Sequence, residues 1–358
     1  MTILLIHPGA SHSTADVEAG LRAGLERLGV DVIQYRLDGR LKASEAYLTA
    51  AYRRAKKTQP AIDKPTWADV VYQAGMGALE RALRFQVDAV LVVSAILLHP
   101  DVIILLRRAG LPVAALFTES PYDLDQELTV ARLVDTCWTN ERSCLPAFQA
   151  VQPNAGYLPC AWHPDRHTPV TDPDTSVPAH DVVFVGSGFP SRIDFLAAMD
   201  WTGIDLGLYG TWQNVSKRHP LRGFVHQGVV DNRAAVALYR RAKLGLNLYR
   251  GGVLVDGQPL LPSLGDSLNP RAYELAACGV FHLSEARAEL TDVFGDLVPT
   301  FTTPAEASAL VRWWFPRDAE RARRAAQLST CVAGASWDQR AARVVRDLEL
   351  LVSRRRAA

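Results

Sequence analysis

The amino-acid sequence predicts an α/β protein made of two similar halves whose parallel sheets face a cleft between them. Short runs rich in Val, Ile and Leu alternate with longer segments of helical period along the 358 residues, which is typical of parallel βα units covered on both faces. The alternation stops in the proline- and aspartate-rich stretch 163–181, near the middle of the chain, and then begins again. Two similar halves joined in this way favour a ligand cleft between two sheets.

The domain boundaries follow from that interruption. We predict an N-terminal domain over residues 1–165, a linker over 166–180 and a C-terminal domain over 181–335. Residues 336–358 have apolar side chains at helical spacing, so we expect a last helix that packs back on the N-terminal domain.

The alternation also gives the individual elements. In the first half we expect helices over 15–28 and 67–85, and strands over 2–6, 31–35, 88–94, 112–118, 135–139 and 156–158. In the second half the expected strands are DVVFVG, IDLGLYG, the stretch 224–230, KLGLNLY, VFHLS and LVPTF. The segment 41–65, with its lysines and arginines, has no pattern that predicts a structure.

The composition argues against several kinds of partner. The chain has 39 lysines and arginines against 38 aspartates and glutamates, so its overall charge does not indicate nucleic acid. Five cysteines without a C-x-x-C pair predict reduced thiols, with neither zinc nor disulfides. The start MTILLIHPGA has no basic leader, and no apolar run reaches the length of a membrane span. We therefore expect a cytoplasmic protein.

Ligands of open parallel sheets bind beyond the carboxyl ends of the strands, so the loops there are the first candidates for a site. In HPGASHST, His12 lies among hydroxyl side chains and is a candidate contact for a sugar or a phosphate; the alternative is a capped turn. In TESPYD, Glu119 follows another strand and is a candidate base, or else a loop cap.

The loop GSGFPSR follows the first strand of the second half and places Gly186 and Gly188 ahead of Arg192. A glycine turn that opens a helix offers N–H groups to a pyrophosphate, and Arg192 adds two charged donors. A dinucleotide fingerprint is one alternative, but Ser191 stands at the third glycine position and no acidic residue ends the next strand. A surface arginine is the other alternative.

The segment SLNPRAYELAACG, residues 267–279, predicts a helix together with its start and its end. Asn269 is a typical N-cap, Pro270 fits the first helical position, and Gly279 suits a left-handed exit. The apolar helix nevertheless carries Arg271 and Glu274 on one face.

These two charges have separate predicted partners. Arg271 and the helix start offer positive charge to a phosphate, while Glu274 fits a pair of vicinal hydroxyls such as those of ribose. Asp266 lies eight positions before Glu274 and completes a D-x7-E spacing. The alternative is an ordinary intrahelical pair of Arg271 and Glu274.

A longer pattern surrounds these residues. The chain resembles the group 1 glycosyltransferases, and within them the CgeB-like branch and its phage-borne relatives, in SLNPRAYELAACGVFHLSE, FTESPYD, TNER, YLPCAWHPDRH, DVVFVGSGFPSR, GVVDNRAAVALYRRAKLGLNLYR and ELTDVFG. The resemblance covers most of the chain. It implies the GT-B fold, in which two Rossmann-like domains with parallel sheets face an interdomain cleft. The nucleotide-sugar is then held mostly by the C-terminal half and generally without a metal.

The resemblance also implies roles for individual residues. Glu274 corresponds to the acid that holds the ribose, and Asp266 stands where the family has a glutamate near the donor sugar. We assign the diphosphate to Arg192, Arg250, Ser267, Asn269 and Arg271, and the ribose and base to Glu274, Gly186, Gly188, Gln227, Gly228, Val229 and Val230. The catalytic candidates are Asp266 together with His12 and Glu119 on the acceptor side.

The sequence thus predicts a metal-independent glycosyltransferase that uses a nucleotide-sugar, in our interpretation a UDP-sugar, as a substrate and needs no cofactor. The motif favours retention of configuration; inversion with Glu119 or His12 as the base is the alternative. Other hypotheses are a non-catalytic nucleotide-sugar-binding relative, an epimerase and a phage enzyme that modifies DNA bases. The acceptor remains open among protein, glycan, small molecule and modified DNA base.

Overall fold

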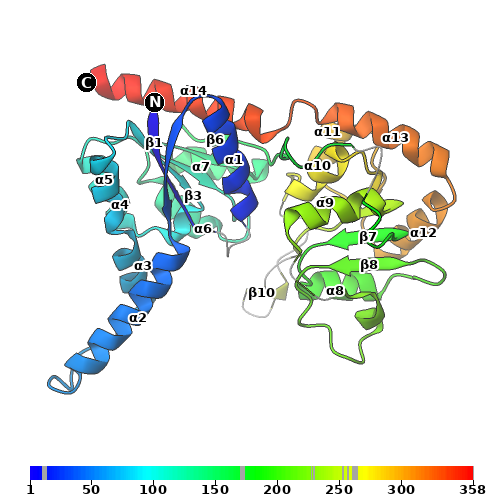
Figure 1. Ribbon diagram of the computed structural model, residues 1–358, viewed down its shortest axis with the longest axis horizontal. Helices are drawn as coiled ribbons and strands as arrows, with labels where there is room; N and C mark the ends of the chain where they lie inside the picture. The colour runs from blue at the N-terminus through cyan, green and yellow to red at the C-terminus, as the bar shows by residue number, and fades with distance from the viewer. Residues whose placement is uncertain are drawn as a thin grey trace. The chain divides into compact units, whose positions relative to one another are not determined.

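The computed structural model describes residues 1–9, 14–169, 174–226, 228, 230–251, 254–255, 258–259 and 265–357. The chain forms two compact units, Met1–Pro159 with Asp338–Ala358, and Cys160–Trp337. Both units are α/β (Figure 1). None of the helices in the described ranges combines the length and the apolar character that crossing a bilayer requires.

The first unit is built on a parallel sheet of strand order β2-β1-β3-β4-β5-β6. Its strands are β1 (Thr2–His7), β2 (Asp31–Arg36), β3 (Ala89–Val93), β4 (Val113–Phe117), β5 (Thr136–Thr139) and β6 (Gly156–Tyr157). The central strands β3 and β4 are buried along their whole length, which explains their unbroken apolar sequences AVLVV and VAALF.

Most helices of this unit lie around the sheet, whereas α2 runs away from it (Figure 1). The helices are α1 (Ala15–Arg27), α2 (Asp38–Ala55), α3 (Trp67–Gly75), α4 (Gly77–Arg84), α5 (Pro100–Arg108), α6 (Leu124–Ala131), α7 (Leu145–Val151) and α14 (Trp337–Ala357), with short 3-10 turns η1 (Ala95–Leu97) and η2 (Arg142–Cys144). The last helix, α14, packs on the first unit, where the Trp138 indole N–H donates to Asp347 over 3.0 Å and Arg340 donates to the carbonyl of Pro159.

The second unit contains a parallel sheet of order β13-β12-β9-β7-β8. Its strands are β7 (Val182–Val185), β8 (Leu206–Tyr209), β9 (Leu244–Asn247), β12 (His282–Glu285) and β13 (Thr300–Phe301); β10 (Leu254–Val255) and β11 (Gln258–Pro259) form a separate antiparallel pair. Its helices are α8 (Pro190–Ala197), α9 (Asn232–Arg241), α10 (Pro270–Ala277), α11 (Ala288–Phe294), α12 (Pro304–Trp314) and α13 (Asp318–Cys331), with a 3-10 turn η3 (Pro220–Phe224).

The predicted α/β class with two parallel sheets is confirmed, but three elements differ. The expected helix 67–85 is two helices, since the hydroxyl of Tyr35 donates to the carbonyl of Ala74 over 2.7 Å at the break. The expected strand 224–230 is wrong at its start, because Pro220 begins η3 and Val225 makes only an isolated bridge. The sequence also gave no indication of α2.

Candidate functional site

The strand order of the second sheet places two loops side by side. The chain passes from β7 to β8 on one side and returns to β9 on the other, so β7 and β9 are neighbours with a change of direction between them. Ligands of open α/β sheets bind at such a switch point, outside the carboxyl ends of the strands. The loops after β7 and β9 are therefore the candidate site of this unit.

The loop after β7 is shaped by two glycines. A Cβ on Gly188 would lie 2.5 Å from the buried ring of Trp212, and a Cβ on Gly186 would lie 2.4 Å from Nη2 of Arg271. The Gly186 amide donates to the carbonyl of Tyr209 over 2.9 Å, so this turn is also fixed to β8. The glycines therefore allow an aromatic ring and a guanidinium to approach the backbone closely.

Arg192 joins the loops after β7 and β9. Its guanidinium donates to the carbonyls of Ser187, Leu248 and Tyr249, each over 3.1 Å, and only 8% of the residue is exposed. The predicted contact with a diphosphate stays a prediction. What the structure adds is that Arg192 braces the two loops that a ligand at this edge would meet.

Arg271 approaches the same edge from α10. Its Nε donates to the carbonyl of Val185 over 2.8 Å, and its Nη1 donates to the carbonyl of Leu248 over 3.1 Å. The guanidinium carbon lies 4.5 Å from the ring centroid of Phe184. Two positive charges, those of Arg192 and Arg271, thus gather at the carboxyl ends of β7 and β9.

The start of α10 is held by an amide that the sequence analysis missed. The Asn269 side chain accepts from the amide of Ala272 over 3.1 Å, which confirms the predicted N-cap. Its Nδ2 donates to Oδ1 of the fully buried Asn247 over 2.9 Å, and Arg271 donates to the same oxygen over 3.3 Å. The sequence feature that could have predicted this role is a single asparagine, Asn247, within the apolar run KLGLNLY.

The segment before α10 is held by α11. The Glu289 carboxylate accepts from the amide of Leu268 over 2.6 Å, and the Glu289 amide donates to the carbonyl of Asp266 over 3.1 Å. Arg287 donates to the carbonyl of Gly265. Glu289 and Arg287 were not predicted, although Glu289 stands in ELTDVFG. The half-buried Asp266 and the buried Ser267 thus lie on a fixed piece of backbone.

Two further predicted donor-site residues lie at the rim. Glu274 is half-buried one turn into α10, close enough to α9 that its charge adds to burial in raising the pKa of the Tyr239 hydroxyl. Arg250 is half-buried after β9, with its guanidinium carbon 5.0 Å from the ring centroid of Phe189. The roles of both residues toward a ligand stay predictions.

Only part of the predicted base-binding segment is described. Gln227 and Val229 lie outside the described residues, while Gly228 is exposed with a φ of +125° and Val230 is half-buried. The ring of His226 stacks on Tyr209 at 4.5 Å with an interplanar angle of 7°. This stack fixes the start of the segment to the carboxyl end of β8.

The carboxyl edge of the first sheet carries a second group of polar residues. His12 lies outside the described residues. Glu119 follows β4, where its Oε1 accepts from the Thr118 hydroxyl over 3.4 Å. Thr118 also lies 2.6 Å, oxygen to oxygen, from the hydroxyl of Ser94, which ends β3 in a left-handed conformation with φ of +54°. Neighbouring strand ends thus present hydroxyls and a carboxylate.

His7 lies at this edge and was not predicted as a site residue; His12 is the predicted histidine of the same loop. His7 ends β1, is 2% exposed, and neither ring nitrogen has a hydrogen-bond partner within the described ranges. Burial lowers its pKa, although the carboxylate of Glu18 lies 3.7 Å from Nδ1. A histidine directly after the apolar run TILLI was the signal.

Glu127 fixes the backbone beside Glu119. Its carboxylate accepts from the amide of Glu119 over 2.8 Å and from the hydroxyl of Ser120. The side chain is fully buried, and burial raises its pKa to about 7. Glu127 was not predicted, because no strand or helix end marks it in the sequence.

The raised pKa of Glu127 predicts a dependence of stability on pH. The folded state keeps the proton up to about pH 7, whereas the unfolded state loses it near the ordinary value of 4.5. Stability should therefore fall by about 3 kcal/mol as the pH rises through that window. Urea unfolding of Glu127→Gln should lack this fall, while Glu80→Gln, an exposed glutamate on α4, should keep it. An identical fall in both variants would contradict the assignment.

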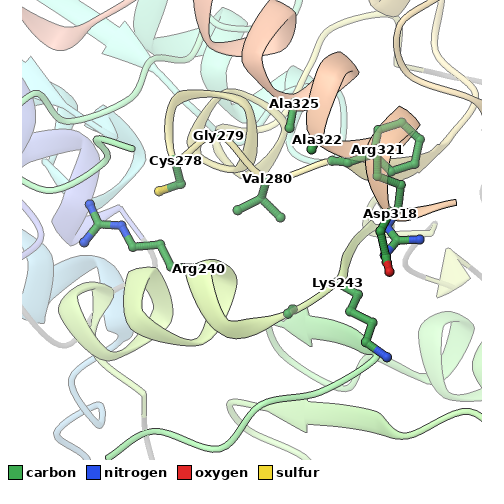
Figure 2. A pocket seen from close by; sticks show the side chains of 11 residues that line it. Arg240, Lys243, Cys278, Gly279, Val280, Asp318, Arg321, Ala322 and Ala325 are labelled. Carbon is green, nitrogen blue, oxygen red and sulfur yellow. The ribbon is translucent and has the colours of Figure 1, made fainter. Parts of the chain in front are cut away.

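A separate hollow of about 240 Å³ lies at the amino ends of β9 and β12, the opposite edge from Arg192 and Arg271 (Figure 2). Its cations already have partners. Lys243 lies 2.9 Å from Asp181, and Arg240 donates to the carbonyl of Arg166 over 3.1 Å. We therefore assign the ligand edge to the carboxyl ends of the strands. In the described part of the chain, no three His, Cys, Asp or Glu side chains are grouped to hold a metal ion.

Comparisons with known proteins agree with this arrangement. Residues 192–346 match the model of a family described as "Glycosyl transferase-like". The spore protein CgeB of Bacillus subtilis (strain 168) is 24% identical over 211 residues, which are 57% of this chain and 65% of the relative. The chain thus aligns with slightly less than two thirds of that relative's length.

Solved structures resemble the chain over nearly its whole length. Sucrose-phosphate synthase from Thermosynechococcus elongatus has a TM-score of 0.69 at 16% identity, covering 98% of this chain and 99% of that chain. A structure described as trehalose-6-phosphate from E. coli bound with UDP-2-fluoro glucose has a TM-score of 0.62 at 9% identity, covering 97% and 99%. The predicted resemblance is therefore confirmed: the chain has the GT-B fold and is similar to the CgeB-like group 1 glycosyltransferases.

Proposed function

We propose that this protein is a glycosyltransferase that transfers a sugar from a UDP-sugar to an acceptor without a metal ion. The observation that supports it most is the convergence of Arg192 and Arg271 on the loops at the switch point of the second sheet. Support also comes from the likeness to glycosyltransferases and from a similar structure that is bound with UDP-2-fluoro glucose.

The proposed chemistry requires stabilisation of a departing diphosphate. Two fixed guanidinium groups and the start of α10 supply positive charge without reorganising during the reaction. Arg250, Ser267 and Asn269 would complete the diphosphate site, and Glu274 would hold the ribose. The loop containing Gly186 and Gly188, with the segment 227–230, would meet the rest of the nucleoside.

The acceptor would bind to the first unit. Thr118 and Glu119 at the end of β4 can hydrogen-bond hydroxyls, and the buried His7 ends β1 at the same edge of the sheet. We propose retention of configuration with Asp266 near the donor sugar; Glu119, His7 and His12 are the candidate bases if configuration is inverted. All five cysteines are free thiols, which supports a reducing compartment such as the cytoplasm.

Incubation with a panel of nucleotide-sugars tests the proposal. We expect slow hydrolysis of a UDP-sugar, measured as release of UDP, in buffer containing a chelator. Thermal stabilisation by UDP-sugars without turnover would instead identify a non-catalytic binder, and conversion of the sugar without an acceptor would identify an epimerase. Activity that disappears with the chelator and returns with a divalent cation would refute the metal-independent mechanism.

A further inference from the structure

The feature that the proposed site leaves unused is the arm formed by residues 41–66. The helix α2 begins at Asp38, directly after β2, and only Leu41 and Ser44 of its residues are buried. Figure 1 shows α2 as the long blue helix that runs away from the strands of the first unit. Most of the helix thus lies outside the core. A helix with so few buried residues gains little stability from packing, so its packing does not explain why it is there.

A groove of about 360 Å³ runs between α2 and the segment that leads into α3. Its apolar lining comes from Leu48, Tyr52, Pro65, Trp67 and Val70, and its polar lining from Glu45, Thr49, Arg53, Lys64 and Thr66. Trp67 is 56% exposed. A large aromatic ring kept in water beside a groove is typical of a binding surface.

The arm concentrates positive charge. Residues 41–66 contain six lysines and arginines against two acidic residues, whereas the whole chain has 39 basic and 38 acidic residues. Within the described ranges, no carboxylate forms an ion pair with Arg53 or Lys64 at the groove. The arm is therefore complementary to a negatively charged partner.

The position of the groove limits the size of that partner. The carboxyl edge of the sheet holds His7 and Glu119, and α2 leaves from the same edge at Asp38. Arg53 lies about 20 Å farther along the helix at the rise of an α-helix. Only an extended molecule can contact both the strand ends and the groove, so a single sugar is too short.

We propose that the arm docks an anionic glycan chain, which is the acceptor of the glycosyltransferase proposed above, on which this inference rests. The ring face of the exposed Trp67 suits the C–H faces of sugar rings, because aromatic faces carry negative charge. Glu45 and the two threonines of the groove can hydrogen-bond sugar hydroxyls. Glu45 opposes a polyanion more strongly the more closely its charges are spaced, so it disfavours the dense phosphates of a nucleic acid more than the widely spaced carboxylates of a glycan. The groove is concave, whereas a membrane-bound helix presents an outward apolar face.

Direct binding tests this proposal with the full chain. Isothermal titration should show binding of a hyaluronan decasaccharide and none of a dextran oligosaccharide of the same length. The double variant Arg53→Glu with Lys64→Glu should weaken hyaluronan binding at least about tenfold, since attraction becomes repulsion. Trp67→Ala should weaken it without any change in charge.

The matched control is Arg108→Glu with Arg132→Glu, which makes the same charge change at two exposed arginines of the first unit outside the arm. It should bind hyaluronan as the unmodified protein does, and equal weakening in both double variants would refute the groove. Tighter binding of oligo(dT) or of phosphatidylglycerol vesicles would also refute a glycan partner. UDP-sugar hydrolysis is measured separately on each variant; its absence with groove-dependent binding would refute the proposed function and leave the docking surface standing.

Discussion

Replacement of Arg271 by alanine is expected to lower kcat/KM for UDP-sugar hydrolysis roughly a hundredfold or more. An effect of this size is typical when an enzyme loses one preorganised group that stabilises the charge developing in the transition state. The guanidinium lies at the carboxyl ends of β7 and β9 with its N–H groups on the carbonyls of Val185 and Leu248. Alanine removes both the positive charge and this bracing. Steady-state kinetics of UDP release measure the effect.

Two further variants separate charge from bracing. Arg271→Lys keeps the charge but cannot make the forked contacts of a guanidinium, so we expect it to recover only part of the activity. Arg323→Ala removes an exposed arginine from α13 of the same unit and should leave kinetics unchanged. Urea unfolding of each variant reports any loss of stability. Turnover by folded Arg271→Ala with unchanged donor affinity would show that the donor site lies elsewhere.

The sequence was sufficient wherever a structure is determined by residues close together in the chain. In the helix α10, the cap at Asn269, the proline at the first position and the left-handed Gly279, with φ of +68°, all lie where the local pattern predicts them. The buried strands could be predicted equally well, because short apolar runs bounded by turn residues are typical of strands buried on both faces.

Contacts between distant parts of the chain could not be read in this way. The pattern around Arg192 and Arg271 predicts cations at helix starts, but not that both donate to the carbonyl of Leu248, which is more than fifty residues from Arg192. Buried polar groups such as Asn247 and Glu127 are equally hidden. Their neighbours in the sequence are apolar or unremarkable, and their partners come from other strands and helices.

The long helix α2 shows a different limit. Its apolar stripe is weak, because only Leu41 and Ser44 are buried and Leu48 is partly buried against the core. Hydrophobic periodicity predicts a helix from the face that it buries, so a helix that projects into water leaves little signal. The lysines and arginines that obscured the pattern of this segment are the residues that make the arm a candidate docking surface.

Two different replacements of Asn247, compared with each other, should separate its contribution to stability from its effect on donor binding. Its side chain is fully buried, accepts from Asn269 and Arg271, and donates to the hydroxyl of Ser284 over 3.0 Å. Asn247→Leu has a similar volume but leaves these groups without their partner. We expect a loss of about 3 kcal/mol in the free energy of unfolding, together with a strong loss of turnover.

Asn247→Asp changes the charge and keeps the shape. A carboxylate at this position still accepts from Asn269 and Arg271, so we expect a smaller loss of stability than in the leucine variant. It also places a negative charge beside Arg271. This charge should raise the KM for a UDP-sugar, because it repels the diphosphate and partly neutralises the guanidinium of Arg271. The increase should shrink at high salt if part of the repulsion is screened. An aspartate variant that binds UDP as tightly as the unmodified protein would show that Arg271 does not face the diphosphate, and its guanidinium would then serve only to hold the loops after β7 and β9 together.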